Sequence, residues 1–405
     1  MKSQVDNWSV DYEWKTVVVL ALGFGLVGLD RWIIAPLFPF IMKDLGINFS
    51  QLGAIVGILG IGWGVSAIFF GNLSDVLGRR SVLIPALLLF SLLAGFTGLA
   101  GSFMMLMTLR LIMGVSEGAF LPASSAATSE ASNPKRRGFN QGFQLSLFAF
   151  LGLGLGPIIA TQLLQIVPSW RYVFMLVSIP GFLLAIFVYF IIREPGREKG
   201  EDHPVHHSRW GEVFGSRNVI LAVLGILSSM CCIFVIGAMI PSYLMDVLKL
   251  SPQTMGFVTS AVGFGGFFGE FGVPGLSDLL GRRNAAIISF LAAIPLLYAF
   301  MHTGPNPTLL FVLLFFIGMF TLGLLGLFTG PIATEGVSPK AKATAIGLVS
   351  GSGEIFGGGI APALGGYIAQ HYGLPHVLDL AMAGLVLGLV VVLFLRETAP
   401  RFAKA

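Results

Sequence analysis

The sequence predicts an all-α membrane protein: twelve transmembrane helices in two pseudo-symmetric six-helix bundles. Hydrophobic residues make up 55% of the 405-residue chain and charged residues only 11%, whereas a soluble domain is typically about 25% charged. Apolar runs of about 20 residues recur along the whole chain, each long enough to cross a hydrocarbon core about 30 Å thick. The runs are continuous rather than alternating, so they do not match the strands of an outer-membrane barrel.

The apolar runs give the expected helices in chain order. They fall at about 15–41, 51–72, 81–101, 103–127, 139–165, 171–192, 218–245, 252–276, 284–303, 307–333, 342–369 and 376–396. The largest polar insert follows the sixth run. We therefore expect a first bundle over 1–192, a cytoplasmic linker over 193–217 and a second bundle over 218–405.

The positions of lysine and arginine orient these helices. With both termini cytoplasmic, nineteen of the 24 Lys and Arg residues fall on the cytoplasmic side, whereas Lys43, Arg171 and Lys249 face outward. Because this asymmetry satisfies the positive-inside rule, we expect an integral protein of the cytoplasmic (inner) or plasma membrane. No cleavable signal peptide is expected, since the first apolar run is of full membrane length. The net charge of +4 reflects these loops and does not indicate nucleic-acid binding.

A loop sequence occurs twice, half a chain apart. The stretch NLSDVLGRR at 72–80 returns as GLSDLLGRR at 275–283, an offset of 203 residues. A second echo has an offset of 205 and joins Glu130, Pro134, Lys135 and Gly142 to Glu335, Pro339, Lys340 and Gly347. Two matches at nearly one offset indicate duplication of a six-helix unit.

We interpret the repeated loops as latches of a gate. Their aspartates lie near a helix end, their arginines hold the loop on the cytoplasmic side, and a glutamate before the next basic loop of each half is a candidate partner. The candidate gating residues are Asp75, Arg79, Arg80, Glu130, Asp278, Arg282, Arg283 and Glu335. The alternative is that these loops only anchor the topology.

Four charged residues lie where lipid-spanning helices usually carry none: Asp30 and Arg31 in the first run, Arg110 and Glu117 in the fourth. A charge near the bilayer centre costs about 2.5–3.5 kcal/mol on insertion scales, so such residues usually face a cavity, pair together and mark a transport path. Arg110 and Glu117 are separated by about two helical turns and project from nearly one face. Asp30 and Arg31 differ by about 100° around their helix, so at most one points fully at a central cavity. The alternative is a buried network that only locks the two helices together.

These residue types suggest separate roles. An arginine offers a planar fork of donors that matches a carboxylate in two-point contact, so Arg31 and Arg110 are candidates to hold an anionic substrate. Asp30 and Glu117 are candidates to carry a coupled proton, because the charge of a carboxyl group depends on burial and on nearby arginines. We hypothesise that protonating Asp30 or Glu117 releases an arginine from an internal ion pair, and that the substrate carboxylate takes its place.

Other buried polar residues are weaker candidates. Glu270 in the eighth run and Glu354, within a glycine-rich stretch of the eleventh, are secondary candidates for coupling, pairing or gating. Gln144 is the best candidate for a hydrogen bond to substrate hydroxyls, and Tyr243 is a further one. The alternative for these residues is that they simply bond neighbouring helices.

No enzyme, cofactor or metal site is expected. The six histidines lie in the linker (His203, His206, His207) or at the outer ends of helices (His302, His371, His376). The adjacent cysteines Cys231 and Cys232 are expected to be packing residues. The membrane-embedded part therefore offers neither a Ser–His pair nor a metal-ligand set, and the coupling ion is expected to be H⁺.

The loop pattern G-x-L-x-D-x-x-G-R-R, nearly matched at 71–80 and repeated half a chain later, resembles the signature of the major facilitator superfamily. Within that superfamily, the Asp30-Arg31 pair, RLIMGVSEGAFLP at 110–122 and IPSYL at 240–244 resemble the anion:cation symporters, which include sugar-acid and sialin-like organic anion carriers. The pairs in the first and fourth helices are also similar to those of spinster-like lysolipid carriers.

The resemblance implies proton-coupled symport of a small organic anion, a sugar acid or another carboxylate, by alternating access. It places the substrate-binding arginines at Arg31 and Arg110, and implies a monomer whose partners are the anion, protons and the lipid bilayer. The alternative is a proton-antiport exporter of lysolipids or amphipathic drugs, which the stretch GLGP at 154–157 favours. A third interpretation is a transporter-like sensor, for which long cytoplasmic extensions would be expected.

Overall fold

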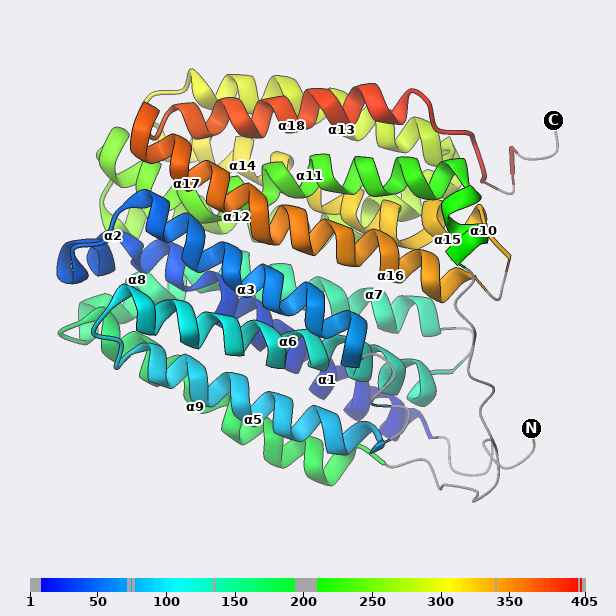
Figure 1. Ribbon diagram of the computed structural model, residues 1–405, viewed down its shortest axis with the longest axis horizontal. Coiled ribbons are helices and arrows are strands. Elements are labelled where there is room, and N and C mark those ends of the chain that lie inside the picture. The colour runs from blue at the N-terminus through cyan, green and yellow to red at the C-terminus, as the bar shows by residue number, and fades with distance from the viewer. Residues whose placement is uncertain are drawn as a thin grey trace.

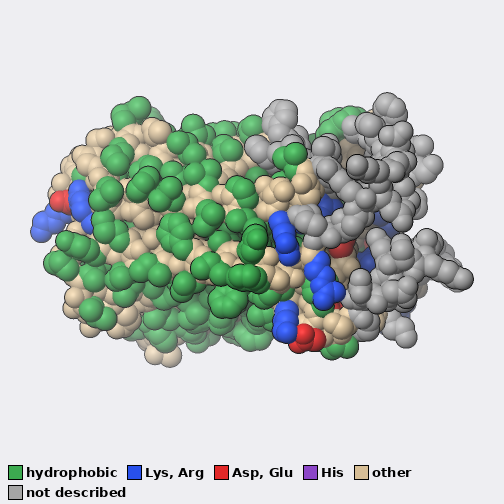
Figure 2. All heavy atoms as spheres, turned by 90° about the horizontal axis from the view of Figure 1, so that it is seen from below, with side chains coloured by type: hydrophobic (Ala, Val, Ile, Leu, Met, Phe, Trp, Pro, Cys, Tyr) green, Lys and Arg blue, Asp and Glu red, His purple; other side chains and the backbone are tan. Residues whose placement is uncertain are grey.

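The structure, a computed structural model, describes residues 9–70, 74, 77–133, 136–193, 210–338, 341–399 and 401–402. All regular elements within these ranges are helices. Nine spans of the described chain are long and apolar enough to cross a membrane. Figure 2 shows hydrophobic side chains over the middle of the molecule and Lys and Arg towards its two ends, the distribution that a bilayer requires. The predicted fold class, an all-α membrane protein, is confirmed.

The first half of the chain forms six membrane-length spans. They are α1 (Val10–Trp32) with α2 (Ile34–Leu45), α3 (Phe49–Phe70), α5 (Arg79–Thr97), α6 (Phe103–Ala131), α7 (Arg137–Phe148) with the π-helix η1 (Ala149–Leu155) and α8 (Gly156–Ile166), and α9 (Trp170–Ile191). Serine side chains begin several of them: Ser102 Oγ, for example, accepts from the Met105 amide at 3.2 Å. Such caps satisfy amide groups that have no partner inside the helix.

The second half repeats this arrangement after the short helix α10 (Trp210–Gly215). Its spans are α11 (Arg217–Ser242) with η2 (Tyr243–Val247), α12 (Pro252–Leu280), α13 (Arg282–Met301), α14 (Pro307–Leu327) with η3 (Phe328–Ile332) and α15 (Ala333–Glu335), α16 (Lys342–Gly353) with η4 (Glu354–Ile360) and α17 (Ala361–Tyr372), and α18 (His376–Val392). Most of the proposed linker lies outside the described residues, so the expected domain boundaries stay predictions.

The repeated loops turn in the same way. Gly78 has φ 96° and Gly281 has φ 94°, and each is the residue immediately before a helix, α5 and α13 respectively. These are left-handed conformations that glycine adopts without steric cost. The two glycines of the sequence repeat therefore have the same backbone role in both halves.

Figure 1 shows the two halves as two layers of helices, with α1 beginning and α18 ending at the same end of the molecule. Three helices make contacts between the halves: α3 packs on η4 and α17, α12 packs on η1, α7 and α8, and α11 packs on α2. Glycine makes the contacts of α3 and α12 close. A Cβ at Gly60 of α3 would collide with the main chain of Gly358, and one at Gly263 of α12 would collide with the main chain of Gly154.

Replacing Gly60 with alanine is expected to lower the free energy of unfolding by about 1–3 kcal/mol, because overpacking the contact between α3 and η4 destabilises the protein by about that amount. The reason is that the added methyl group meets the backbone of Gly358, which cannot rotate away. The thermal midpoint of the detergent-purified protein measures the effect. Gly365→Ala on α17 is the matched control, because its Cβ would make an ordinary 3.5 Å contact with Val235. Equal midpoints for the two variants would contradict the prediction.

Candidate functional site

An ion pair joins the two halves of the molecule. Arg31 Nη2 donates to Glu354 Oε2 at 2.8 Å, and the two side chains are only 1% and 13% exposed. The guanidinium carbon lies 4.7 Å from the ring centre of Phe234 on α11 and 6.0 Å from that of Phe148 on α7. Arg31 belongs to the first half and Glu354 and Phe234 to the second, so the arginine is held between side chains of both.

Arg31 retains donors that this pair does not use. Its Nε and Nη1 atoms are buried and have no hydrogen-bond partner among the described residues. A buried donor without a partner costs about 1–3 kcal/mol, so such atoms in native proteins call for a specific explanation. A polar ligand at this position would provide one.

Arg110 lies within the first half and bonds the backbone of α1. Its Nη1 donates to the carbonyl oxygens of Asp30 at 2.8 Å and of Arg31 at 3.4 Å. Both carbonyls belong to the last turn of α1, which ends at Trp32, and the last four carbonyls of a helix have no partner within it. Arg110 therefore satisfies carbonyls at the break and sets the position of Arg31. A direct contact between Arg110 and substrate stays a prediction.

Asp30 and Glu117 are buried without an ion-pair partner in the described part of the chain. Their exposed fractions are 3% and 0%, and both oxygens of Glu117 and Oδ1 of Asp30 have no hydrogen-bond partner there. Glu117 interacts electrostatically with Arg31, Arg110 and Glu354, and Asp30 with Glu117 and Arg110. The structure thus groups the four charges predicted from sequence, but pairs Arg31 with Glu354 rather than with Asp30 or Glu117.

The other predicted polar residues lie on helices of both halves. Gln144 is buried on α7, where its Nε2 donates to Ser124 Oγ at 2.8 Å and its Oε1 has no partner among the described residues. Tyr243 is buried in the second half, with its ring centre 6.1 Å from that of Phe300. Glu270 lies on α12 two turns beyond Gly263, the glycine that packs on η1, and its Oε2 also has no partner in the described structure. Their roles in binding or coupling stay predictions.

The two repeated loops form equivalent ion pairs. Arg79 Nη2 lies 2.6 Å from Glu130 Oε1, and Arg282 Nη2 lies 2.8 Å from Glu335 Oε1. Arg282 also pairs with Asp278 at 2.6 Å. Each pair ties helices of a single half together, and the gating role proposed for these residues stays a prediction.

The second arginine of each loop bonds a main-chain carbonyl at the end of a helical span. Arg80 donates to the carbonyl of Ile192, and Arg283 donates to that of Leu393 at 2.9 Å. Asp75, the counterpart of Asp278, lies outside the described residues.

A buried acid that sequence reasoning missed lies at the start of α1. Glu13 is 0% exposed and accepts from the Asn133 amide at 3.2 Å, from Arg136 Nη2 at 2.8 Å and from Asn140 Nδ2 at 2.7 Å. It fastens the loop between α6 and α7 to the first helix. A polar residue just before an apolar run is ordinary in sequence, so no signal marked it.

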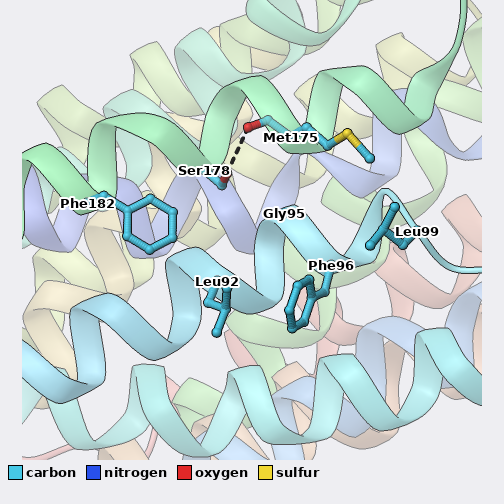
Figure 3. A pocket seen from close by; sticks show the side chains of 7 residues that line it. All are labelled: Leu92, Gly95, Phe96, Leu99, Met175, Ser178 and Phe182. Carbon is cyan, nitrogen blue, oxygen red and sulfur yellow. Dashed lines mark hydrogen bonds between the residues drawn. The ribbon is translucent and has the colours of Figure 1, made fainter.

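The chain also has a shallow apolar groove of about 270 Å³ between α5 and α9, away from the charged cluster. Figure 3 shows Leu92 and Phe96 on one side and Phe182 on the other, with Ser178 Oγ donating to the Met175 carbonyl at 2.7 Å. The hydroxyl group of Ser178 is thus used within its own helix.

In the described residues no group of three His, Cys, Asp or Glu could hold a metal ion. Cys231 and Cys232 are free, buried thiols.

Comparisons with known proteins place the chain among membrane transporters. The family model described as "Major Facilitator Superfamily" matches residues 20–353 and 222–404. Similar curated proteins include a probable 4-methylmuconolactone transporter of Cupriavidus pinatubonensis, 26% identical over 84% of this chain and 81% of that protein. The sialic acid transporter NanX of Escherichia coli is 27% identical over 91% of each. The crystal structure of a bacterial homologue of the human lysosomal transporter Spinster, inward-facing and occupied, superimposes with a TM-score of 0.74 at 20% identity over 95% of each chain.

Proposed function

The chain belongs to the Major Facilitator Superfamily, and from that premise we propose that it is a secondary active transporter. It carries a small organic anion across the membrane together with protons, by alternating access. The substrate class is a sugar acid or another carboxylate. The relatives named as a sialic acid transporter and a probable 4-methylmuconolactone transporter support this class.

The observation that carries the proposal is the buried guanidinium of Arg31. It lies where the halves meet, and its Nε and Nη1 donors have no partner among the described residues. The parallel N–H groups of a guanidinium are the pairs Nε/Nη2 and Nη1/Nη2, so a carboxylate in two-point contact would use one free donor of Arg31 together with Nη2, the atom that donates to Glu354. An anion held there would contact both halves at once, so its binding would affect how the halves pack.

The proton carriers that we propose are Asp30 and Glu117. Both are buried beside Arg31 and Arg110, and neither has an ion-pair partner in the described structure. A buried carboxylate whose neighbours change between conformations changes its proton occupancy with them. Protonation of either acid makes the cluster less negative and so favours entry of an anion.

A second candidate function is proton-antiport export of lysolipids or amphipathic drugs. The aromatic surroundings of Arg31 favour it: Trp32 and Phe234 have ring centres 5.1 Å apart, and Phe148 also lies near the guanidinium. An amphipathic molecule with an anionic head, such as a lysolipid, could place that head on Arg31 and its apolar part on these rings.

Orientation and assembly belong to the same proposal. We propose insertion in an inner or plasma membrane with both termini cytoplasmic, consistent with α1 beginning and α18 ending at one end of the molecule (Figure 1). The protein would act as a monomer, without a cofactor, and with H⁺ as the coupling ion.

A thermal-shift screen of the detergent-purified protein tests the substrate class, with sugar acids, aromatic carboxylates, dicarboxylates, lysolipids and cationic drugs as probes. A ligand that binds only the folded state raises the midpoint according to its occupancy. We expect a shift with a carboxylate, absent in Arg31→Ala, followed by uptake of that anion into proteoliposomes when the outside is acidic. A shift with lysolipids or cations alone would favour the exporter instead.

A further inference from the structure

We propose that Glu354 is an internal stand-in for the substrate carboxylate: it binds Arg31 when the site is empty, and the substrate displaces it. This inference rests on the proposed function, because it assumes that Arg31 is the anion anchor. It adds an assignment for Glu354, which lies 323 residues away from Arg31 in the sequence.

The first support is the position of the bond. Between described residues, the Arg31–Glu354 bond and the bond from the Phe49 amide to Gln370 Oε1 at 3.2 Å both cross between the halves. The Phe49–Gln370 bond lies where α3 begins and is exposed, whereas the Arg31–Glu354 bond is largely shielded from solvent, with side chains 1% and 13% exposed. A substrate that replaces Glu354 would therefore remove the inner hydrogen bond between the halves without disturbing the outer one.

The second support is that the backbone is shaped for this pair. A Cβ at Gly358 would lie 2.7 Å from Arg31 Nη2 and 2.7 Å from Glu354 Oε2, so any larger residue would push the two groups apart. Glu354 also begins η4, and π-helical turns occur frequently at functional sites. The absence of a side chain at Gly358 and the π-helical turn that begins at Glu354 together leave room for a carboxylate to contact the guanidinium of Arg31.

The third support is the balance of charge. The cluster holds three acids, Asp30, Glu117 and Glu354, against two arginines. A second carboxylate on Arg31 would add a like charge beside Glu354, and like charges at short range in a buried site repel strongly. Substrate and Glu354 are therefore expected to be alternative partners of the same guanidinium.

Displacement has a consequence for the transport cycle. An empty site would leave Arg31 buried and unpaired, which is costly, unless another acid takes the place of the substrate. Glu354 supplies that acid from the opposite half. The pair therefore lets the empty carrier return without an uncompensated buried charge.

The test compares binding of N-acetylneuraminate and D-glucuronate to the full-length wild type and to Glu354→Gln. If the internal pair is closed in about nine molecules of ten, its loss raises the apparent affinity about tenfold. Net uptake into proteoliposomes should fall, because the empty return is impaired, while exchange of labelled for unlabelled anion persists. Asp379→Asn, which removes an exposed acid of the second half that pairs locally with His376 at 2.9 Å, is the control and should leave affinity unchanged.

The outcomes separate the inference from the function on which it rests. Binding to Glu354→Gln that is equal to or weaker than wild type, together with loss of binding in Arg31→Ala, would overturn the stand-in role and leave the anion carrier intact. Unchanged binding in Arg31→Ala, or no binding of any tested anion to either protein, would overturn both. If Glu354→Gln does not fold, Glu354→Asp keeps the charge but shortens its reach, and should raise affinity in the same direction.

Discussion

Replacing Arg31 with lysine is expected to weaken binding of the transported anion at least about 30-fold, since loss of a buried, hydrogen-bonded charge contact costs about 2–5 kcal/mol. Lysine keeps the positive charge but lacks the planar fork that binds a carboxylate in two-point contact. The substitution also removes the guanidinium whose carbon lies 4.7 Å from the centre of the Phe234 ring. Isothermal titration with the anion found in the thermal-shift screen measures the change.

The matched control for this prediction is Arg171→Lys. Arg171 also pairs with an acid, Asp44, but its side chain is 30% exposed at an end of the molecule, where ion pairs contribute little. Its substitution should leave anion affinity within about twofold of wild type, in keeping with the small energies of exposed pairs. Wild-type affinity in Arg31→Lys would show that charge alone, and not the fork, holds the substrate.

Replacing Glu117 with glutamine is expected to abolish proton-driven accumulation of the anion while sparing counterflow exchange. Glutamine is close in shape to a protonated glutamate but cannot release a proton, so the cycle should continue only with substrate on both sides. Glu117 is buried and both of its oxygens lack a described partner, so no ion pair among the described residues holds its charge in place.

Proteoliposomes loaded with and without internal anion, at equal and unequal pH, measure the two modes separately. Asp11→Asn is the control, because Asp11 is exposed and pairs only locally, with Lys15 at 2.6 Å. Accumulation that survives in Glu117→Gln would move the coupling role to Asp30 or another acid. The Glu117 variant differs from the Glu354 variant in a further respect: only the latter is expected to bind the anion more tightly.

The two arginines predicted to hold substrate have different surroundings, and this divides their roles. Arg31 reaches between the halves, whereas Arg110 bonds the carbonyls of Asp30 and Arg31 where α1 ends. Both are arginines in apolar runs, so sequence treats them alike. The break at Trp32 explains the difference, because a helix that ends inside the bundle leaves carbonyl groups that need a donor.

Much of the architecture was predictable from the sequence. Composition and run length predicted the membrane helices, and the repeat with its arginines predicted two related halves; the pairs Arg79–Glu130 and Arg282–Glu335 lie where the repeat suggested. These features are local or periodic, since crossing a bilayer needs a continuous apolar helix of fixed length. The presence of Asp30, Arg31, Arg110 and Glu117 as buried charges follows from the same rule.

Only the tertiary structure decides which of those charges meet. Each helix can rotate about its axis and slide against its neighbours without changing its hydropathy, so no pattern along the chain relates Arg31 to Glu354, 323 residues away. The meeting depends on Gly60 and Gly358, whose missing side chains let α3 and η4 approach until their backbones touch. Sequence alone therefore establishes a membrane carrier with buried charges, and the packing of its two halves determines that an arginine of one is bound by an acid of the other.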